Sequence, residues 1–91
     1  MADSKTTTDH QVIKQWVEER SGQPAVVRGT EEIEPPAGML RIKFQDSNED
    51  LKTIDWNTFF DTFEKKKLAF LYQEKTDDSR QSRFFKFVER S

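Results

Sequence analysis

The sequence contains no cysteine, which excludes disulfides, thiolate metal sites and cysteine nucleophiles. It also has no long apolar run, since no segment approaches the roughly 20 apolar residues of a membrane-spanning helix. Residues 1–5 lack the apolar segment of a signal peptide. The three glycines form no glycine-rich loop that would hold a phosphate group. These absences lead us to expect a cytoplasmic protein with no membrane contact, no metal and no cofactor.

Aromatic residues, by contrast, are abundant. The chain has eight Phe, two Trp and one Tyr, and each buried ring removes roughly 150–250 Å² from water. They compensate for an apolar fraction of only 33% in a chain whose 91 residues suit one domain. The net charge is −2, and the second half of the chain is more basic than the first. This asymmetry is too mild for the basic stripe of a dedicated nucleic-acid binder.

Two segments have the period of amphipathic helices, because apolar residues recur every three or four positions over residues 9–20 and 56–66. Thr8 and Gln11 have the spacing of a capping box before the first helix. Asp55 precedes the second helix, and its carboxylate can accept the free N–H groups there. The second helix has four aromatic residues on one face: Trp56, Phe59, Phe60 and Phe63.

Apolar and polar residues alternate in further segments, which predicts β-strands. The predicted strands are residues 39–44, 51–54, 68–73 and 84–89. The second of these could pair back onto the first, and the last two should form a hairpin. Whether residues 24–28 form an additional edge strand stays open. We therefore predict an α+β fold with two helices packed on a small, mainly antiparallel sheet, in the order α-(β)-β-β-α-β-β. Residues 1–8 are predicted to be a disordered tail and residues 9–91 a single domain.

No catalytic constellation is visible in the sequence. His10 is the only histidine, and its neighbour Asp9 would not face it on a helix. Carboxylates are plentiful, but nothing marks a pair of them as acid and base. Residues 46–50 are rich in oxygen ligands but lack the glycine and final glutamate of a calcium loop. We therefore expect a protein that is not an enzyme.

Basic residues are interleaved with aromatic ones in the second half of the chain. Such a pattern can bind single-stranded nucleic acid through phosphate pairing and base stacking. The alternative is that the rings belong to the core and the charges to an ordinary surface. The candidate basic patch consists of Lys65, Lys66, Lys67, Arg80, Arg83 and Lys86.

A second candidate site comes from the alternation along the last two strands. Consecutive residues of a strand point to opposite faces, so Phe84 and Phe85 are split between the two faces of the sheet. If both helices cover the same face, the other face exposes apolar side chains, which is typical of a partner surface. The residues expected there are Ala69, Leu71, Phe84 and Val88.

Several stretches together resemble a family of small uncharacterised bacterial proteins, some of which carry the name 1,4-alpha-glucan branching enzyme. They are DHQVIKQW (9–16), GQPA (22–25), GMLRIKF (38–44), IDW (54–56) with Phe59 and Phe60, LAFLYQ (68–73) and SRF (82–84). Branching enzymes are built on a (β/α)₈ barrel, which needs at least about 200 residues. The resemblance therefore implies a small stand-alone domain without that activity, and it supplies no site residue.

Three functional hypotheses follow. The first is a non-catalytic protein-interaction module that binds an unknown protein partner or forms a homodimer. The second is a weak nucleic-acid-binding protein that uses the basic patch. The third is an accessory domain linked to glycan metabolism, which rests on the resemblance.

Overall fold

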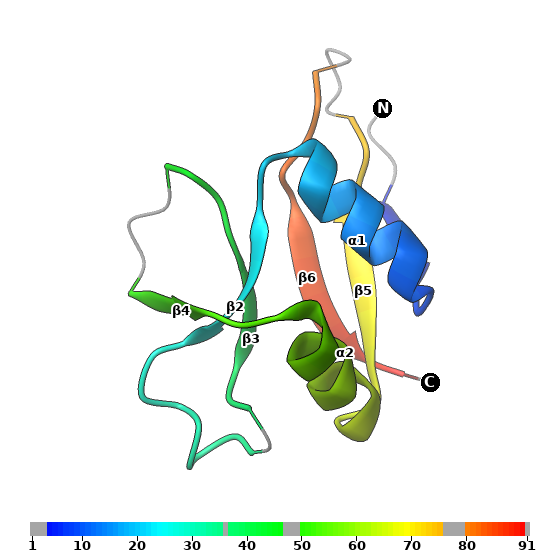
Figure 1. Ribbon diagram of the computed structural model, residues 1–91. Helices are drawn as coiled ribbons and strands as arrows, with labels where there is room; N and C mark the ends of the chain where they lie inside the picture. Colours follow the sequence, from blue (N-terminus) through cyan, green and yellow to red (C-terminus); the bar gives the residue numbers. More distant parts are fainter. Residues whose placement is uncertain (1–3, 36, 47–49, 76–79, 91) are drawn as a thin grey trace.

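The computed structural model describes residues 4–35, 37–46, 50–75 and 80–90, which contain two helices and six strands. In chain order the elements are β1 (Ser4–Thr7), α1 (His10–Glu19), β2 (Gln23–Val27), β3 (Leu40–Lys43), β4 (Leu51–Thr53), α2 (Trp56–Lys65), β5 (Leu68–Gln73) and β6 (Phe85–Glu89) (Figure 1). The predicted α+β class is confirmed. The strands, however, form two antiparallel three-stranded sheets, ordered β1-β5-β6 and β3-β2-β4.

The N-terminal segment is a strand and not a disordered tail. β1 pairs antiparallel with β5, with Ser4 opposite Gln73 and Thr7 opposite Phe70. The prediction for residues 1–8 is therefore wrong for residues 4–7, while residues 1–3 lie outside the described residues. β1 has four polar residues and no apolar alternation, so its sequence carries no strand signal. It forms because β5 offers it an unpaired backbone edge on the side away from β6.

β2 is the central strand of its sheet. It pairs with β3 on one side and with β4 on the other, so β3 and β4 do not form the hairpin that the sequence suggested. A proline in a central strand usually costs a ladder hydrogen bond. Here the carbonyl of Pro24 still accepts a bond from the Ile54 amide (3.0 Å), one residue beyond the end of β4. Pro24, which has no N–H to donate, thus lies at the end of the β2–β4 ladder.

The helix starts follow from aspartate caps. Oδ1 of Asp55 accepts a bond from the Thr58 amide at 2.6 Å, which confirms the predicted start of α2. At α1 the capping residue is Asp9, whose Oδ1 accepts from the Gln11 amide at 2.9 Å. The capping box that the spacing of Thr8 predicted is therefore wrong. A carboxylate at this position also interacts favourably with the positive end of the helix dipole.

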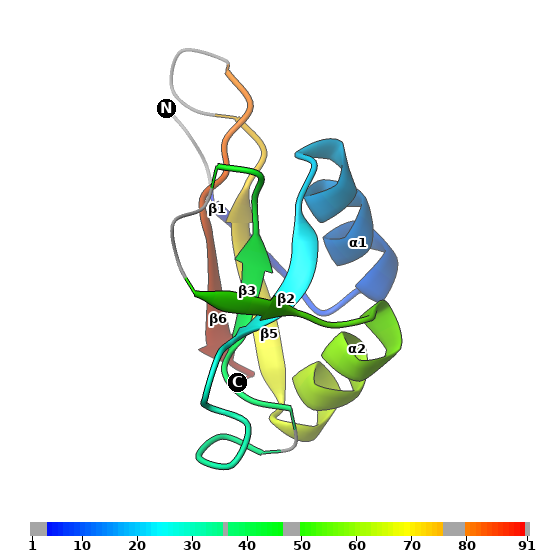
Figure 2. The ribbon, with the colours of Figure 1, turned by 60° about the vertical axis from the view of Figure 1, so that its left-hand side comes forward.

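One hydrophobic core joins both sheets and both helices. The fully buried large side chains come from four elements, which are α1, α2, β2 and β5. They include Ile13, Val17, Val26, Phe59, Phe63 and Phe70. Figure 2 shows α1 and α2 along one side of the two sheets. On α2, the two aromatics of the predicted stripe that reach the centre are Phe59 and Phe63, while Trp56 and Phe60 are half-buried at its edge.

A buried arginine connects α1 to the β5–β6 connection. The side chain of Arg20 is 3% exposed. Its Nη1 and Nη2 donate to the carbonyls of Trp16 and Glu74, both at 2.9 Å, and its Nε donates to the carbonyl of Ser82. The guanidinium lies 4.2 Å from the centroid of the Trp16 ring. Burial lowers the pKa of Arg20, but three carbonyls and one aromatic face compensate the buried charge.

We expect Phe63→Ala to lower the free energy of unfolding by about 3–5 kcal/mol, the range for losing a fully buried ring. Phe60→Ala is the matched control on the same helix, and it should cost clearly less because Phe60 is only half-buried. Urea denaturation of the two variants measures both values. Equal losses would contradict the assignment of Phe59 and Phe63 to the centre of the core.

Candidate functional site

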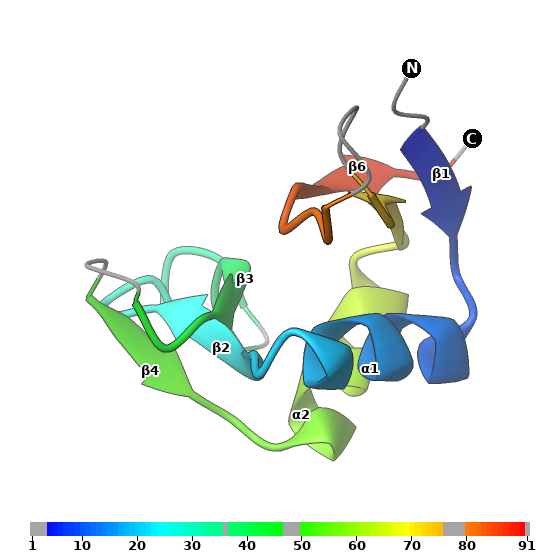
Figure 3. The same ribbon diagram turned by 90° about the horizontal axis from the view of Figure 1, so that it is seen from above.

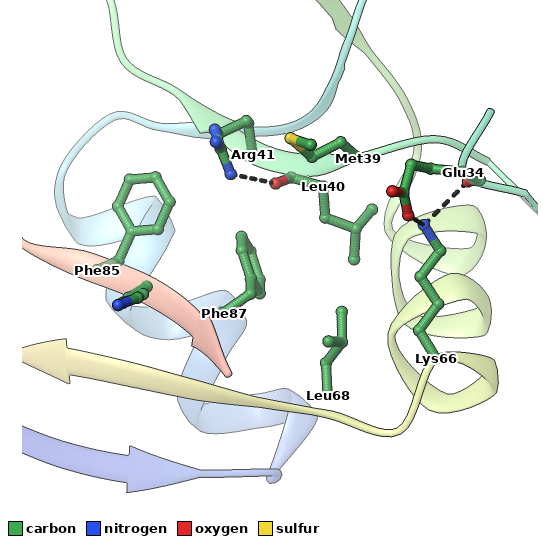
Figure 4. Close-up of a pocket in the computed structure, with 9 residues that line it drawn as sticks. Glu34, Met39, Leu40, Arg41, Lys66, Leu68, Phe85 and Phe87 are labelled. Atoms are coloured by element: carbon green, nitrogen blue, oxygen red, sulfur yellow. Dashed lines mark hydrogen bonds and ion pairs between the residues drawn. The ribbon is translucent and has the colours of Figure 1, made fainter. Parts of the chain in front are cut away.

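A cavity of about 500 Å³ lies between the edge strands β3 and β6 (Figure 4). Its volume falls within the range of about 300–1,000 Å³ that is usual for binding sites. We call it the β3–β6 groove. Its lining consists of Glu34, Met39, Leu40, Arg41, Lys66, Leu68, Phe85, Lys86 and Phe87. Seen from above, the two sheets lie on different sides of the molecule, and the two helices lie together along a third side (Figure 3).

The floor of the β3–β6 groove is apolar. Figure 4 shows the side chains of Leu40, Leu68 and Phe87 pointing into the same space from three different strands. Leu40 is buried, whereas Leu68 and Phe87 are half-buried. Met39, immediately before β3, is 38% exposed. An apolar floor beside an exposed methionine is suited to taking up apolar side chains of a ligand.

The rim of the groove is positively charged. Nζ of Lys66 donates to the carbonyls of Glu34 and Gly38, both at 2.9 Å, and lies 3.3 Å from Oε2 of Glu34. The charge of Lys66 is therefore matched by the carboxylate of Glu34. Arg41 and Lys86 form no ion pair within the part of the chain that the structure describes. Two positive charges at the rim are thus left without an ion-pair partner among the described residues.

The backbone edge of β6 faces this groove. The Phe84 carbonyl accepts a hydrogen bond on the β5 side at 3.3 Å, and the Arg90 amide donates one on the same side at 2.9 Å. Peptide groups alternate sides along a strand, so those of Phe85, Phe87 and Glu89 point away from β5. Across residues 4–35, 37–46, 50–75 and 80–90, no strand pairs with this side of β6. The groove is therefore bordered by an open strand edge.

The edge of β3 is partly closed by a side chain. The Met39 carbonyl bonds the Val27 amide of β2 at 2.9 Å, so alternation turns the peptide groups of Leu40 and Ile42 to the other side. Nη1 of Arg41 donates to the carbonyl of Leu40 at 3.2 Å, as drawn in Figure 4. Arg41 thus occupies one of the acceptors of this edge.

The structure does not gather the predicted basic patch into one charged surface. Lys65 is 3.2 Å from Asp61, and Nη1 of Arg83 is 2.7 Å from Oδ1 of Asp46. Lys67 and Arg80 are exposed. Two of the six predicted residues, Lys66 and Lys86, line the β3–β6 groove. At least three of the six, Lys65, Lys66 and Arg83, hold carboxylates, which reduces the positive field available to a phosphate backbone.

The predicted apolar surface on the other face of β5 and β6 is smaller than expected. Phe85 packs against the core and Phe84 is 46% exposed, so the two are divided as the alternation suggested. Leu71 and Val88 are half-buried. Ala69 is only 5% exposed, so its expected place on an exposed surface is wrong. Of the four predicted residues, Phe84 is the most exposed.

His10 takes part in an ion cluster that sequence reasoning missed. Its Nε2 is 2.8 Å from Oε2 of Glu64, and Nη2 of Arg90 donates to the same oxygen at 2.9 Å. The His10 ring stacks on Phe60 with centroids 4.1 Å apart. The hydrogen bonds from Arg90 and His10 lower the pKa of Glu64 to about 2. The cluster joins the start of α1, the end of α2 and the segment after β6.

Neither a metal site nor a membrane helix is found in the described ranges. No group of three His, Asp or Glu residues there could hold a metal ion. The oxygens of Asp46 are engaged by Arg83, and residues 47–49 of the oxygen-rich segment lie outside the described residues. No helix among the described residues is long and apolar enough to cross a membrane.

Comparison with known proteins finds no matching family model, no matching curated protein and no matching solved structure. The resemblance to small bacterial proteins therefore stays a prediction.

The Glu64 cluster leads to a pH-dependent prediction. Because the folded pKa is about 2 against an ordinary 4.5, the bonds of Glu64 contribute their full stability above about pH 4.5. This contribution is lost as the pH falls toward 2. We expect Glu64→Gln to lower stability at pH 7 and to make the decline between pH 4.5 and 2 less steep than in the parent protein.

Urea denaturation at a series of pH values measures this effect. Asp61→Asn is the matched control, since it removes an exposed carboxylate of the same helix that pairs only with Lys65 among the described residues. If the control changes the acid decline as much as Glu64→Gln does, the shifted pKa of Glu64 is not its cause.

Proposed function

We propose that this protein is a non-catalytic protein-interaction module that binds a polypeptide in the β3–β6 groove. The observation that carries the proposal is the combination, at one place, of an apolar floor, a strand edge and two positive charges, where the edge pairs with no strand and the charges form no ion pair within the part of the chain that the structure describes. The proposed compartment is the cytoplasm, because a chain without cysteine needs no oxidising environment.

The lining residues argue against catalysis in this groove. An enzyme needs a positioned acid, base or nucleophile beside its substrate. The one carboxylate of the lining belongs to Glu34, and it is engaged by Lys66. The remaining lining residues are cationic or apolar. Such a set can bind and orient a ligand, but it offers no group to exchange protons with it at neutral pH.

The groove suits a polypeptide better than a small molecule or a nucleic acid. A row of backbone N–H and C=O groups at a strand edge is complementary to the backbone of another chain. Nucleic-acid binding is less favoured, because Lys65, Lys66 and Arg83 already hold carboxylates. The link to glycan metabolism is supported by the resemblance alone.

Selection of linear peptides from an unbiased display library tests the proposed function. We expect the selected peptides to lose binding when Met39→Glu places a carboxylate at the exposed rim of the groove. Phe84→Glu is the matched control, because Phe84 is also exposed but does not line the groove, and it should leave binding unchanged. Affinities measured by fluorescence polarisation, with circular dichroism to check folding, give the comparison.

Two outcomes would count against this proposal. If Phe84→Glu abolishes binding and Met39→Glu does not, the partner surface is the outer face of β5 and β6. If no peptide is selected by the folded parent protein, binding of a linear polypeptide is contradicted.

A further inference from the structure

We infer that the occupant of the β3–β6 groove is an extended, acidic peptide segment that adds to β6 as a further strand. The inference rests on the proposed function and names the chemistry and the binding mode of the partner. Strand addition provides affinity through main-chain hydrogen bonds, and side chains at alternate positions provide specificity.

Comparison of the four edge strands selects β6. β1 has four polar residues and carries Lys5, which are features that discourage strand addition. β4 has three residues, two of them exposed. On β3, the Leu40 carbonyl is already bonded by Arg41. β6 has five residues, and its unpaired peptide groups lie beside the apolar floor of the groove.

The charges at the rim select an acidic partner. Arg41 and Lys86 both line the groove, and neither has an ion-pair partner among the described residues. Carboxylates on an incoming segment would compensate both charges. A second copy of this protein would instead bring its own Arg41 and Lys86 to the same place. Like charges at a contact oppose association, so the second copy is the less favourable occupant.

The dimensions of β6 define the segment. Five residues of a strand cover about 17 Å, so a segment of about five or six residues can pair along β6. Successive side chains of a strand point to opposite faces. One set therefore faces the apolar floor formed by Leu68 and Phe87, and the other set lies toward the charged rim. An alternating apolar and acidic sequence satisfies both sets.

The probe is a capped, fluorescently labelled hexapeptide of alternating valine and aspartate, compared with the same peptide carrying lysine in place of aspartate. We expect the acidic peptide to bind the parent protein about tenfold more tightly than the basic one, as two charge pairs allow. The double variant Arg41→Glu with Lys86→Glu should reverse this preference. Lys65→Glu with Lys67→Glu changes the net charge equally outside the groove and should leave it unchanged.

Backbone methylation of the acidic peptide tests strand addition. Methyl groups on the amides at one alternate set of positions should abolish binding, whereas those at the other set should have little effect, because only one set bonds β6. Equal binding of the two methylated peptides would overturn strand addition. Binding of both the acidic and the basic peptide with equal affinity would overturn the acidic partner.

These failures are distinguishable from failure of the proposed function. If the hexapeptides do not bind but peptides selected from the unbiased library still require Met39, the inference of an acidic added strand is contradicted. The proposed function as an interaction module is then still supported. Sedimentation velocity at the assay concentration tests the other possible occupant of the groove, a second copy of the protein. A dimer of the parent protein that Met39→Glu dissociates would show that a second copy fills the groove, and it would overturn the inference.

Discussion

Neither sheet can bury its apolar face alone, and this constraint determines the rest of the architecture. A sheet with one apolar face must bury that face against another layer, so each of these sheets packs against the helices. α2 serves both, since it contacts β2 and β3 in one sheet and β5 in the other. Phe59 and Phe63 fill the space between them. α2 is thus one of the elements that bridge the sheets, and within the described residues the edges of β3 and β6 pair with no further strand.

A second constraint acts at the end of α1. Arg20 bonds carbonyls on both sides of the β5–β6 connection, and Nε1 of Trp16 donates to the Gln73 carbonyl at 2.8 Å. A buried guanidinium without such partners would be strongly destabilising. The two side chains are one helical turn apart, so the helix presents them together. The position of β6, and with it one wall of the β3–β6 groove, is thereby tied to α1.

The parts of this fold that could be predicted are those encoded within one segment. Periodicity gave both helices, Asp55 gave the start of α2, and alternation gave β5 and its pairing with β6. The division into two sheets depends on which strand takes the centre. Pro24 favoured an edge position for residues 24–28, whereas β2 is the central strand. The groove was missed because its walls come from segments about 45 positions apart. Lys66 and Lys86 were predicted to belong to a basic patch, but only the tertiary structure brings both of them to the groove.

The pairing of β1 with β5 has a kinetic consequence. Lys5 and Glu74 form an ion pair although they are 69 positions apart in the chain. Closing so long a loop costs entropy before any contact compensates for it, and folds rich in such contacts cross their barrier slowly. During synthesis β1 leaves the ribosome long before its partner exists. We therefore expect the β3-β2-β4 sheet to assemble first, with the sheet containing β6 closing last.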